Sequence, residues 1–141
     1  MAHITFYEKP GCENNRRQKE WLVLAGHTLE VINILTHPWT KDELRRFFHG
    51  KTVPECFNPA APDIKSGQLD PSGMSMEQAI ELMISNPLLI RRPLMEFELS
   101  FIQGFDPALL SSIINLEPVR ENEPLIKTLK MLDLSSCPRA S

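Results

Sequence analysis

The sequence has little of what would place it in several large classes of protein. No apolar run approaches the length of a membrane span, and the first residues enter a strand pattern without the charged start and long apolar stretch of a secretory signal. Basic residues are not in excess, because 15 lysines and arginines stand against 18 acidic residues, a net charge of −3. These absences predict a cytoplasmic protein that does not enter a membrane and lacks the basic footprint of a nucleic-acid-binding domain.

Cysteine is also scarce. The three cysteines, Cys12, Cys56 and Cys137, are odd in number and widely spaced, which excludes a disulfide framework. No CxxC pair provides the adjacent thiol that resolves an oxidised cysteine in many redox proteins, and no spacing of cysteine and histidine is typical of a zinc site. We therefore expect no bound metal or cofactor, and any thiol chemistry must rely on one cysteine and an external partner.

Internal repeats and low-complexity segments are absent as well, so the chain has the organisation of an ordinary compact domain. Its 141 residues are enough for one hydrophobic core and too few for two. We expect one domain over residues 1–116. Residues 117–141 are interpreted as a C-terminal extension, with a short amphipathic helix that Pro124 opens and a flexible tail.

The stretch that carries chemistry lies near the N-terminus. A strand predicted over residues 3–7 ends at a Pro-Gly pair, and Cys12 follows directly before a helix predicted over 13–26. A thiol at the first turn of a helix faces unpaired N–H groups and the positive end of the helix dipole, which favour the nucleophilic thiolate. Arg16 lies one turn further on. Most lone cysteines are small core residues, but this position at a strand-to-helix turn favours a reactive role for Cys12.

The remaining elements follow from apolar periodicity, capping and proline punctuation. A second strand is predicted over residues 27–35, and capping boxes at Thr40 and Ser75 each open a helix. The proline-rich residues 51–73 favour loops and isolated turns. Two strands with a tight turn near Glu98 and a helix capped by Asp106, running to about residue 114, complete the pattern.

The order of these elements predicts an α/β protein with a thioredoxin-like fold. A strand–helix–strand unit implies two parallel strands, and the later strand–strand–helix unit implies an antiparallel hairpin with a helix. The helices and loops at about residues 37–90 form a helical insertion after the second strand. The predicted order of elements is therefore β-α-β, the insertion, and then β-β-α.

Two segments carry a resemblance to a known family. Residues 7–16 read YEKPGCENNR, and residues 86–94 read NPLLIRRPL, with the insertion between them. Together they resemble the ArsC/Spx family, which comprises glutaredoxin-coupled arsenate reductases and related thioredoxin-fold proteins. The resemblance covers roughly residues 3–115. Within this family, residues 9–22 are most similar to the branch called nitrogenase-associated proteins.

The resemblance implies a role for four residues. Cys12 matches the nucleophile, and Arg16 matches the arginine of the cysteine loop. Arg92 matches an arginine that binds an oxyanion or stabilises the thiolate, and Pro93 matches the proline beside the active site, typically in the cis form. Physical chemistry agrees with the last two assignments, because an X–Pro bond can be held cis and a planar guanidinium fork suits a tetrahedral oxyanion.

The departures from the family pattern concern charge. Reductases of this kind carry two further arginines, which fall here near Asn58 and at residues 104–106, where Asp106 has the opposite charge. Glu8 follows the tyrosine, and its carboxylate is expected to disfavour a thiolate and repel an anion. Each lost charged donor costs about 1.5–3 kcal/mol of anion binding. An efficient arsenate reductase is therefore not expected.

Three hypotheses for the function follow, and they leave open whether the chain is an enzyme. The first is an ArsC-like thiol redox protein associated with nitrogen fixation, in which glutathione or a glutaredoxin completes the cycle of Cys12. The second is a non-catalytic interaction protein on the same fold, with a nitrogenase-related protein as its partner. The third is a glutathione- and glutaredoxin-dependent arsenate reductase. Cys56 is interpreted as buried, and the alternative is that it resolves an oxidised Cys12.

Overall fold

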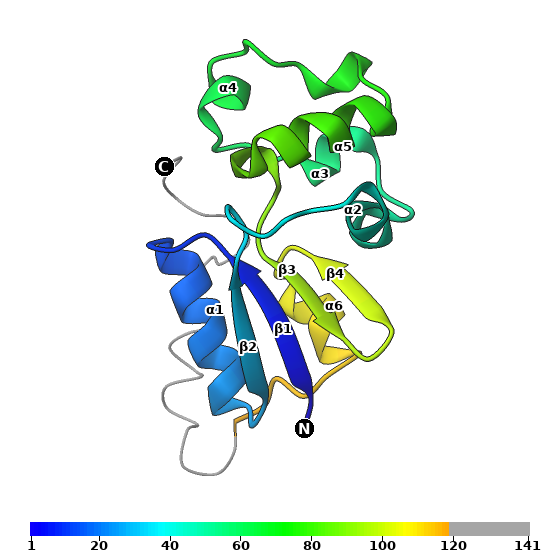
Figure 1. The fold of residues 1–141 in the computed structure, drawn as a ribbon. Helices are drawn as coiled ribbons and strands as arrows, with labels where there is room; N and C mark the ends of the chain where they lie inside the picture. The colour runs from blue at the N-terminus through cyan, green and yellow to red at the C-terminus, as the bar shows by residue number, and fades with distance from the viewer. Residues whose placement is uncertain (119–141) are drawn as a thin grey trace.

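A four-stranded mixed sheet forms the centre of the fold, in the order β2-β1-β3-β4 (Figure 1). The computed structural model describes residues 1–118. Strand β1 (His3–Glu8) pairs in parallel with β2 (Thr28–Asn33) and antiparallel with β3 (Leu94–Phe97), which pairs antiparallel with β4 (Ser100–Gln103). The predicted α/β, thioredoxin-like fold class is confirmed.

One face of the sheet packs against α1 (Glu13–Leu24) and α6 (Pro107–Ser111). Alternate residues of the strands point to this face, so Phe6 and its partner Met95 enter the first core together with Trp21 of α1 and Leu110 of α6. Their neighbours in the strands, such as Tyr7, point to the other face and enter the second core. The period-two alternation therefore divides the apolar residues between two cores.

The helical insertion lies between β2 and β3 and extends beyond one end of the sheet (Figure 1). It supplies most of the second core, in which the rings of Tyr7, Trp39 and Phe47 contact one another. None of the helices in the described part of the chain is long and apolar enough to cross a bilayer. The elements of the insertion are α2 (Lys41–Phe48), α3 (Val53–Cys56), α4 (Pro62–Lys65), the 3-10 turn η1 (Pro71–Gly73), α5 (Met76–Ser85) and the 3-10 turn η2 (Pro87–Leu89).

Local signals account for the ends of most elements. The capping boxes at Thr40 and Ser75 form as predicted, and Thr52 makes a third one at the start of α3. Glu98 takes a positive φ of 54° in the tight turn between β3 and β4. Helix α6 ends at Ser111 rather than near residue 114, because the hydroxyls of Ser111 and Ser112 hydrogen-bond to carbonyls of the preceding turn. The helix expected after Pro124 lies outside the described residues.

Trp21 offers a direct test of the first core. Its indole is 2% exposed, and its Nε1–H donates a 3.0 Å hydrogen bond to the carbonyl oxygen of Leu116. Trp21→Phe removes this donor, leaves a buried carbonyl without its partner and reduces the buried area, so we expect a loss of about 2 kcal/mol in the free energy of unfolding by urea. The matched control Leu99→Ala, at a 93% exposed residue, should change it by less than about 0.5 kcal/mol. Equal effects of both substitutions would contradict this packing.

Candidate functional site

Cys12 lies at the junction between the loop after β1 and the first helical residue of α1. The loop turns at Gly11, whose φ of +84° is one that glycine readily adopts, and the N–H of Cys12 donates to the carbonyl of Lys9 at 3.1 Å. Cys12 is the N-cap residue of α1, as predicted, and so lies at the positive end of the helix dipole, although its side chain makes no capping hydrogen bond. The residue is only 5% exposed, which is more burial than a position at the rim of the fold predicts, but it belongs to neither of the two core clusters.

The first turns of α1 bury amide side chains rather than apolar ones, and these hold the cysteine loop. The Oδ1 atom of Asn15 accepts a 3.1 Å hydrogen bond from the N–H of Lys9, and its Nδ2 donates to Oε1 of Gln18 at 2.9 Å. Sequence reasoning missed both residues. Their spacing was a usable signal, since Asn15, Gln18 and the buried Leu22 follow one another on one face of the helix.

Glu8 does not act as an isolated negative charge beside the loop. Its carboxylate forms an ion pair with the ammonium group of Lys19 on α1, and both side chains are mostly buried. Lys19 therefore compensates the charge that was expected to repel an anion. The effect of Glu8 on the thiolate and on anions stays a prediction, but the structure adds a cation from α1 that sequence reasoning did not pair with it.

Arg92 is the most unusual side chain of the site. Its peptide bond to Pro93 is cis, as the resemblance implies, and Arg92 is 3% exposed. None of the three guanidinium nitrogens has a hydrogen-bond partner among the described residues. A buried guanidinium without a hydrogen-bond partner is costly to the fold, because its charge is desolvated without compensation.

The register of the sheet brings Arg92 to the cysteine loop. Strand β3 starts at the end of the sheet where β1 finishes and α1 begins (Figure 1). Tyr7 pairs with Leu94 at the end of this antiparallel ladder, so residues 92 and 93 precede β3 at the same end of the sheet where Glu8 leads into the cysteine loop. The structure thus brings Cys12, Arg92 and Pro93 to one end of the sheet from distant parts of the sequence.

Backbone hydrogen bonds hold the segment around Arg92 on both sides. On one side, the N–H of Arg91 donates to the carbonyl of Cys56 at 3.0 Å, and the N–H of Asn58 donates to the carbonyl of Leu89 at 2.8 Å. On the other side, the N–H of Gly104 donates to the carbonyl of Pro93 at 2.8 Å. The insertion and the end of β4 therefore fix the backbone that presents Arg92.

Arg16 is not brought into this buried group. Its side chain is 60% exposed and forms ion pairs with Glu13 and, at 3.5 Å, with Glu20, so its guanidinium lies on the outer face of α1. These two carboxylates raise its pKa above the usual value of arginine, the contact with Glu13 having the larger effect. The thiolate-stabilising role that the resemblance implies for Arg16 stays a prediction.

The two positions where further arginines would be expected are used for local structure. Asn58 is buried, and its Oδ1 accepts a 3.0 Å hydrogen bond from the N–H of Ala60. Asp106 is the N-cap of α6 and accepts from the N–H groups of Ala108 and Leu109, at 3.0 and 3.4 Å. Neither position supplies a cation to the site.

Cys56 is buried, as predicted. Its Sγ donates to the carbonyl of Thr52 at 3.4 Å, and burial raises the pKa of the thiol from about 9 to about 11. Neither Cys12 nor Cys56 forms a disulfide. A thiol that stays protonated at neutral pH and is covered by the second core is a poor resolving nucleophile.

The raised pKa of Cys56 predicts a specific dependence of stability on pH. In the unfolded chain the thiol ionises near pH 9, whereas in the folded chain it stays neutral to about pH 11. Its contribution to stability is therefore complete below pH 9 and is lost as the pH rises through this window, by about 2 kcal/mol. As the pH rises from 8 to 11, the free energy of unfolding of the wild type, measured with denaturant, should fall by this amount relative to that of Cys56→Ala. Tyr7, whose pKa burial raises to about 12, contributes equally to both proteins. A constant difference would contradict the prediction.

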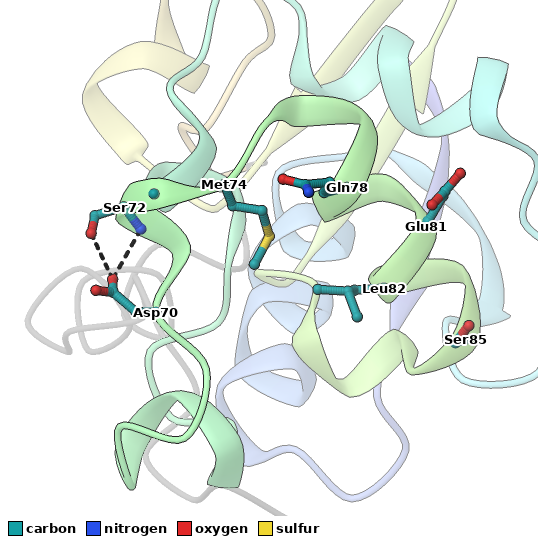
Figure 2. A pocket seen from close by; sticks show the side chains of 8 residues that line it. Asp70, Ser72, Met74, Gln78, Glu81, Leu82 and Ser85 are labelled. Atoms are coloured by element: carbon teal, nitrogen blue, oxygen red, sulfur yellow. Dashed lines mark hydrogen bonds between the residues drawn. The ribbon is translucent and has the colours of Figure 1, made fainter.

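A separate cavity of about 780 Å³ lies within the insertion, between η1 and α5 (Figure 2). Its polar groups are largely occupied by local contacts: Asp70 accepts from Ser72, Gln78 caps the N–H of Ser75, and Glu81 pairs with Lys41. Met74 and Leu82 supply apolar walls. This cavity has none of the chemistry-bearing residues predicted from the sequence.

Comparisons with known proteins relate the chain to one family and to several relatives. A family model described as the ArsC family matches residues 7–112. An uncharacterised 15.7 kDa protein in the draG 3′ region of Rhodospirillum rubrum is 44% identical over 116 residues, which cover 82% of this chain and 81% of the relative. The regulatory protein MgsR of Bacillus subtilis is 24% identical over 121 residues, 84% of this chain and 96% of that protein. The solved structure of an arsenate reductase from Vibrio cholerae has a TM-score of 0.68 at 22% identity, covering 80% of this chain and 98% of its own.

Proposed function

The chain belongs to the ArsC family, and from this membership we propose that it is a thiol redox protein that works with a single cysteine. Cys12 is the nucleophile in this proposal. Arg92 stabilises its thiolate or a bound anion, and Pro93 shapes the backbone beside it. The observation that carries the proposal is the buried guanidinium of Arg92, which has no hydrogen-bond partner in the described part of the chain.

The physical argument concerns the cost of that guanidinium. Side chains that only support a fold avoid a buried charge without a partner, because the desolvation cost of such a charge is several kcal/mol. A thiolate, or an oxyanion held in its place, offsets this cost through charge-assisted hydrogen bonds. The register supports Cys12 as this group, because the Arg92 segment precedes β3 at the end of the sheet where the loop to Cys12 leaves β1.

The proposed chemistry is thiol–disulfide exchange with an external reductant. The Cys12 thiolate attacks one sulfur of a disulfide, the other sulfur leaves as a thiolate, and a mixed disulfide forms. A second thiolate, from glutathione or a glutaredoxin, then attacks the partner sulfur and releases Cys12. An external thiol is needed because Cys56 is buried and its pKa is about 11. The protein binds no cofactor of its own in this scheme.

The test is the ionisation of Cys12, measured as alkylation rate against pH in a Cys56→Ala, Cys137→Ser background. We expect half-ionisation below the value of about 8.5 for a free thiol. Arg92→Gln should move it upward, whereas Arg16→Gln should move it little, because Glu13 already pairs with Arg16 at the surface. Half-ionisation of Cys12 at or above the free-thiol value would overturn the proposal.

The biological setting belongs to the same proposal. It rests on the resemblance of residues 9–22 to nitrogenase-associated proteins, beside which stands the relative from the draG 3′ region of Rhodospirillum rubrum. We propose an association with nitrogen fixation and a nitrogenase-related protein as a partner, in addition to glutathione or a glutaredoxin. A cytoplasmic location without membrane or nucleic-acid binding is proposed with it.

A second candidate function is a non-catalytic interaction protein on the same fold. The similarity to a protein named as regulatory, MgsR, favours it. The two candidates differ in their dependence on the thiol. If the interaction role is correct, the Cys12→Ser variant still captures the partner. It also fully complements the phenotype of the deletion strain. A redox role requires that this variant fail while remaining folded.

A further inference from the structure

A cavity of about 280 Å³ lies on the part of the fold where β4 ends and α6 begins. The hydrogen bond from Gly104 to Pro93 ties this region to the segment of Arg92. Arg91 and Arg92 are neighbours at the bend that precedes β3. Arg91 lines this cavity, whereas Arg92 does not. The lining residues are Lys51, Glu55, Arg91, Gln103, Gly104, Phe105, Asp106 and Pro107.

Gln103 provides an unused hydrogen-bond acceptor at this cavity. The residue is 7% exposed, and its Nε2 donates to the carbonyls of Cys56 and Arg91 at 3.0 and 3.2 Å. These two acceptors fix the orientation of the amide, because a flipped amide would turn its oxygen toward two carbonyl oxygens. The Oε1 atom is buried and has no partner among the described residues. Such an atom requires a donor from elsewhere.

Charged residues of both signs line the same cavity as Gln103. Lys51 and Arg91 have no ion pair with any residue that the structure describes. Both act on Glu55, whose pKa is lowered mainly by hydrogen bonds from Thr52 and further by these two cations. Asp106 adds a second carboxylate, of which only Oδ1 is used by the cap of α6.

From this geometry we propose that the cavity binds an α-amino-acid group, in which an ammonium and a carboxylate share one carbon. The carboxylate is placed at Lys51 and Arg91. The ammonium donates to Oε1 of Gln103, with Asp106 and Glu55 as the compensating negative charges. The volume of about 280 Å³ is below the range of drug-sized ligands and accommodates one such group.

This chemistry has two sources, a free amino acid or the γ-glutamyl end of glutathione. The site itself is independent of the proposed redox function, and only the glutathione source rests on it. Titrations of the ¹⁵N-labelled full-length Cys12→Ser variant, followed by amide shifts, separate binding from thiol chemistry. L-glutamate and glutathione are compared with glutarate, which has both carboxylates but no ammonium.

We expect saturable shifts of the amides of Lys51 and Gly104 with L-glutamate or glutathione, and binding of glutarate weaker by about tenfold. A preference for glutathione over glutamate identifies the γ-glutamyl thiol as the source, and equal binding identifies a free amino acid. Lys51→Gln should weaken binding by about tenfold. The matched control Lys65→Gln, at an exposed lysine of α4, should leave it unchanged.

Three results would overturn the site. The first is the lack of saturable shifts with either ligand up to about 20 mM. The second is glutarate binding as tightly as glutamate, which would reduce the site to one for simple anions. The third is binding that the Lys51→Gln substitution does not weaken, with the ligand-induced amide shifts located in the cysteine loop instead of at the cavity. A normal binding result together with an unreactive Cys12 would retain the site and reject the redox function.

Discussion

Arg92→Met is expected to stabilise the fold and to slow the reaction of Cys12 in the same protein. The guanidinium is 3% exposed and its three nitrogens lack hydrogen-bond partners among the described residues, so its burial opposes folding. Methionine fills similar space without a charge. Replacing buried ionic groups by apolar side chains raises stability by about 1–4 kcal/mol in favourable cases. We expect a gain in this range in the free energy of unfolding by urea.

The loss of reactivity is the second half of this expectation. Without the guanidinium, the thiolate of Cys12 loses a charge-assisted donor, worth about 1.5–3 kcal/mol, so alkylation at pH 7 should slow by about one order of magnitude or more. Arg17→Met is the matched control, because Arg17 is part-exposed on α1 and only its long 3.8 Å ion pair to Glu13 is lost. It should change neither quantity appreciably.

A different pattern would assign Arg92 to the structure of the fold. If Arg92→Met destabilised the protein while Cys12 reacted at the wild-type rate, the guanidinium would be a structural group. Arg92→Lys adds a further distinction, since lysine keeps the charge but loses the planar fork. Partial retention of reactivity in that variant would indicate that charge, rather than bidentate geometry, is what the cysteine needs.

The parts of the site that could be predicted depend on local chemistry. Cys12 as the N-cap of α1 follows from a strand, a Pro-Gly break and a helical pattern within a few residues. The capping boxes of α2 and α5 involve residues three positions apart. The exposed ion pairs of Arg16 were equally readable, because Glu13 and Glu20 stand three and four residues away.

The parts that could not be predicted depend on distant packing. The sequence identifies Arg92 through resemblance, but its burial without a partner arises only when the insertion and β4 hold the segment on both sides. The pairing of Glu8 with Lys19 depends on how α1 packs against the end of β1. No local sequence pattern indicated a role for Gln103, because its side-chain amide donates hydrogen bonds to two carbonyl groups that lie 47 and 12 residues away in sequence.

With arsenate, glutathione and a glutaredoxin, we expect this protein to reduce arsenate at the background rate. The arsenate reductase from Vibrio cholerae serves as the positive control, and Cys12→Ser defines the background. The resemblance implies two arginines that this chain lacks, at Asn58 and near Asp106. The loss of two charged donors costs about 3–6 kcal/mol of anion stabilisation, which corresponds to about two to four orders of magnitude in rate.

The two missing arginines cannot simply be restored by substitution, because Asn58 and Asp106 each have a structural role. Asn58 is buried and caps its own loop, so Asn58→Arg would have to insert a long cation into the second core. Asp106 holds the first N–H groups of α6, and an arginine there would remove the cap and place a cation at the positive end of a helix. Neither single substitution is therefore expected to create turnover. Arsenate reduction well above the Cys12→Ser background would show that Arg92 alone suffices, and would make the chain an arsenate reductase after all.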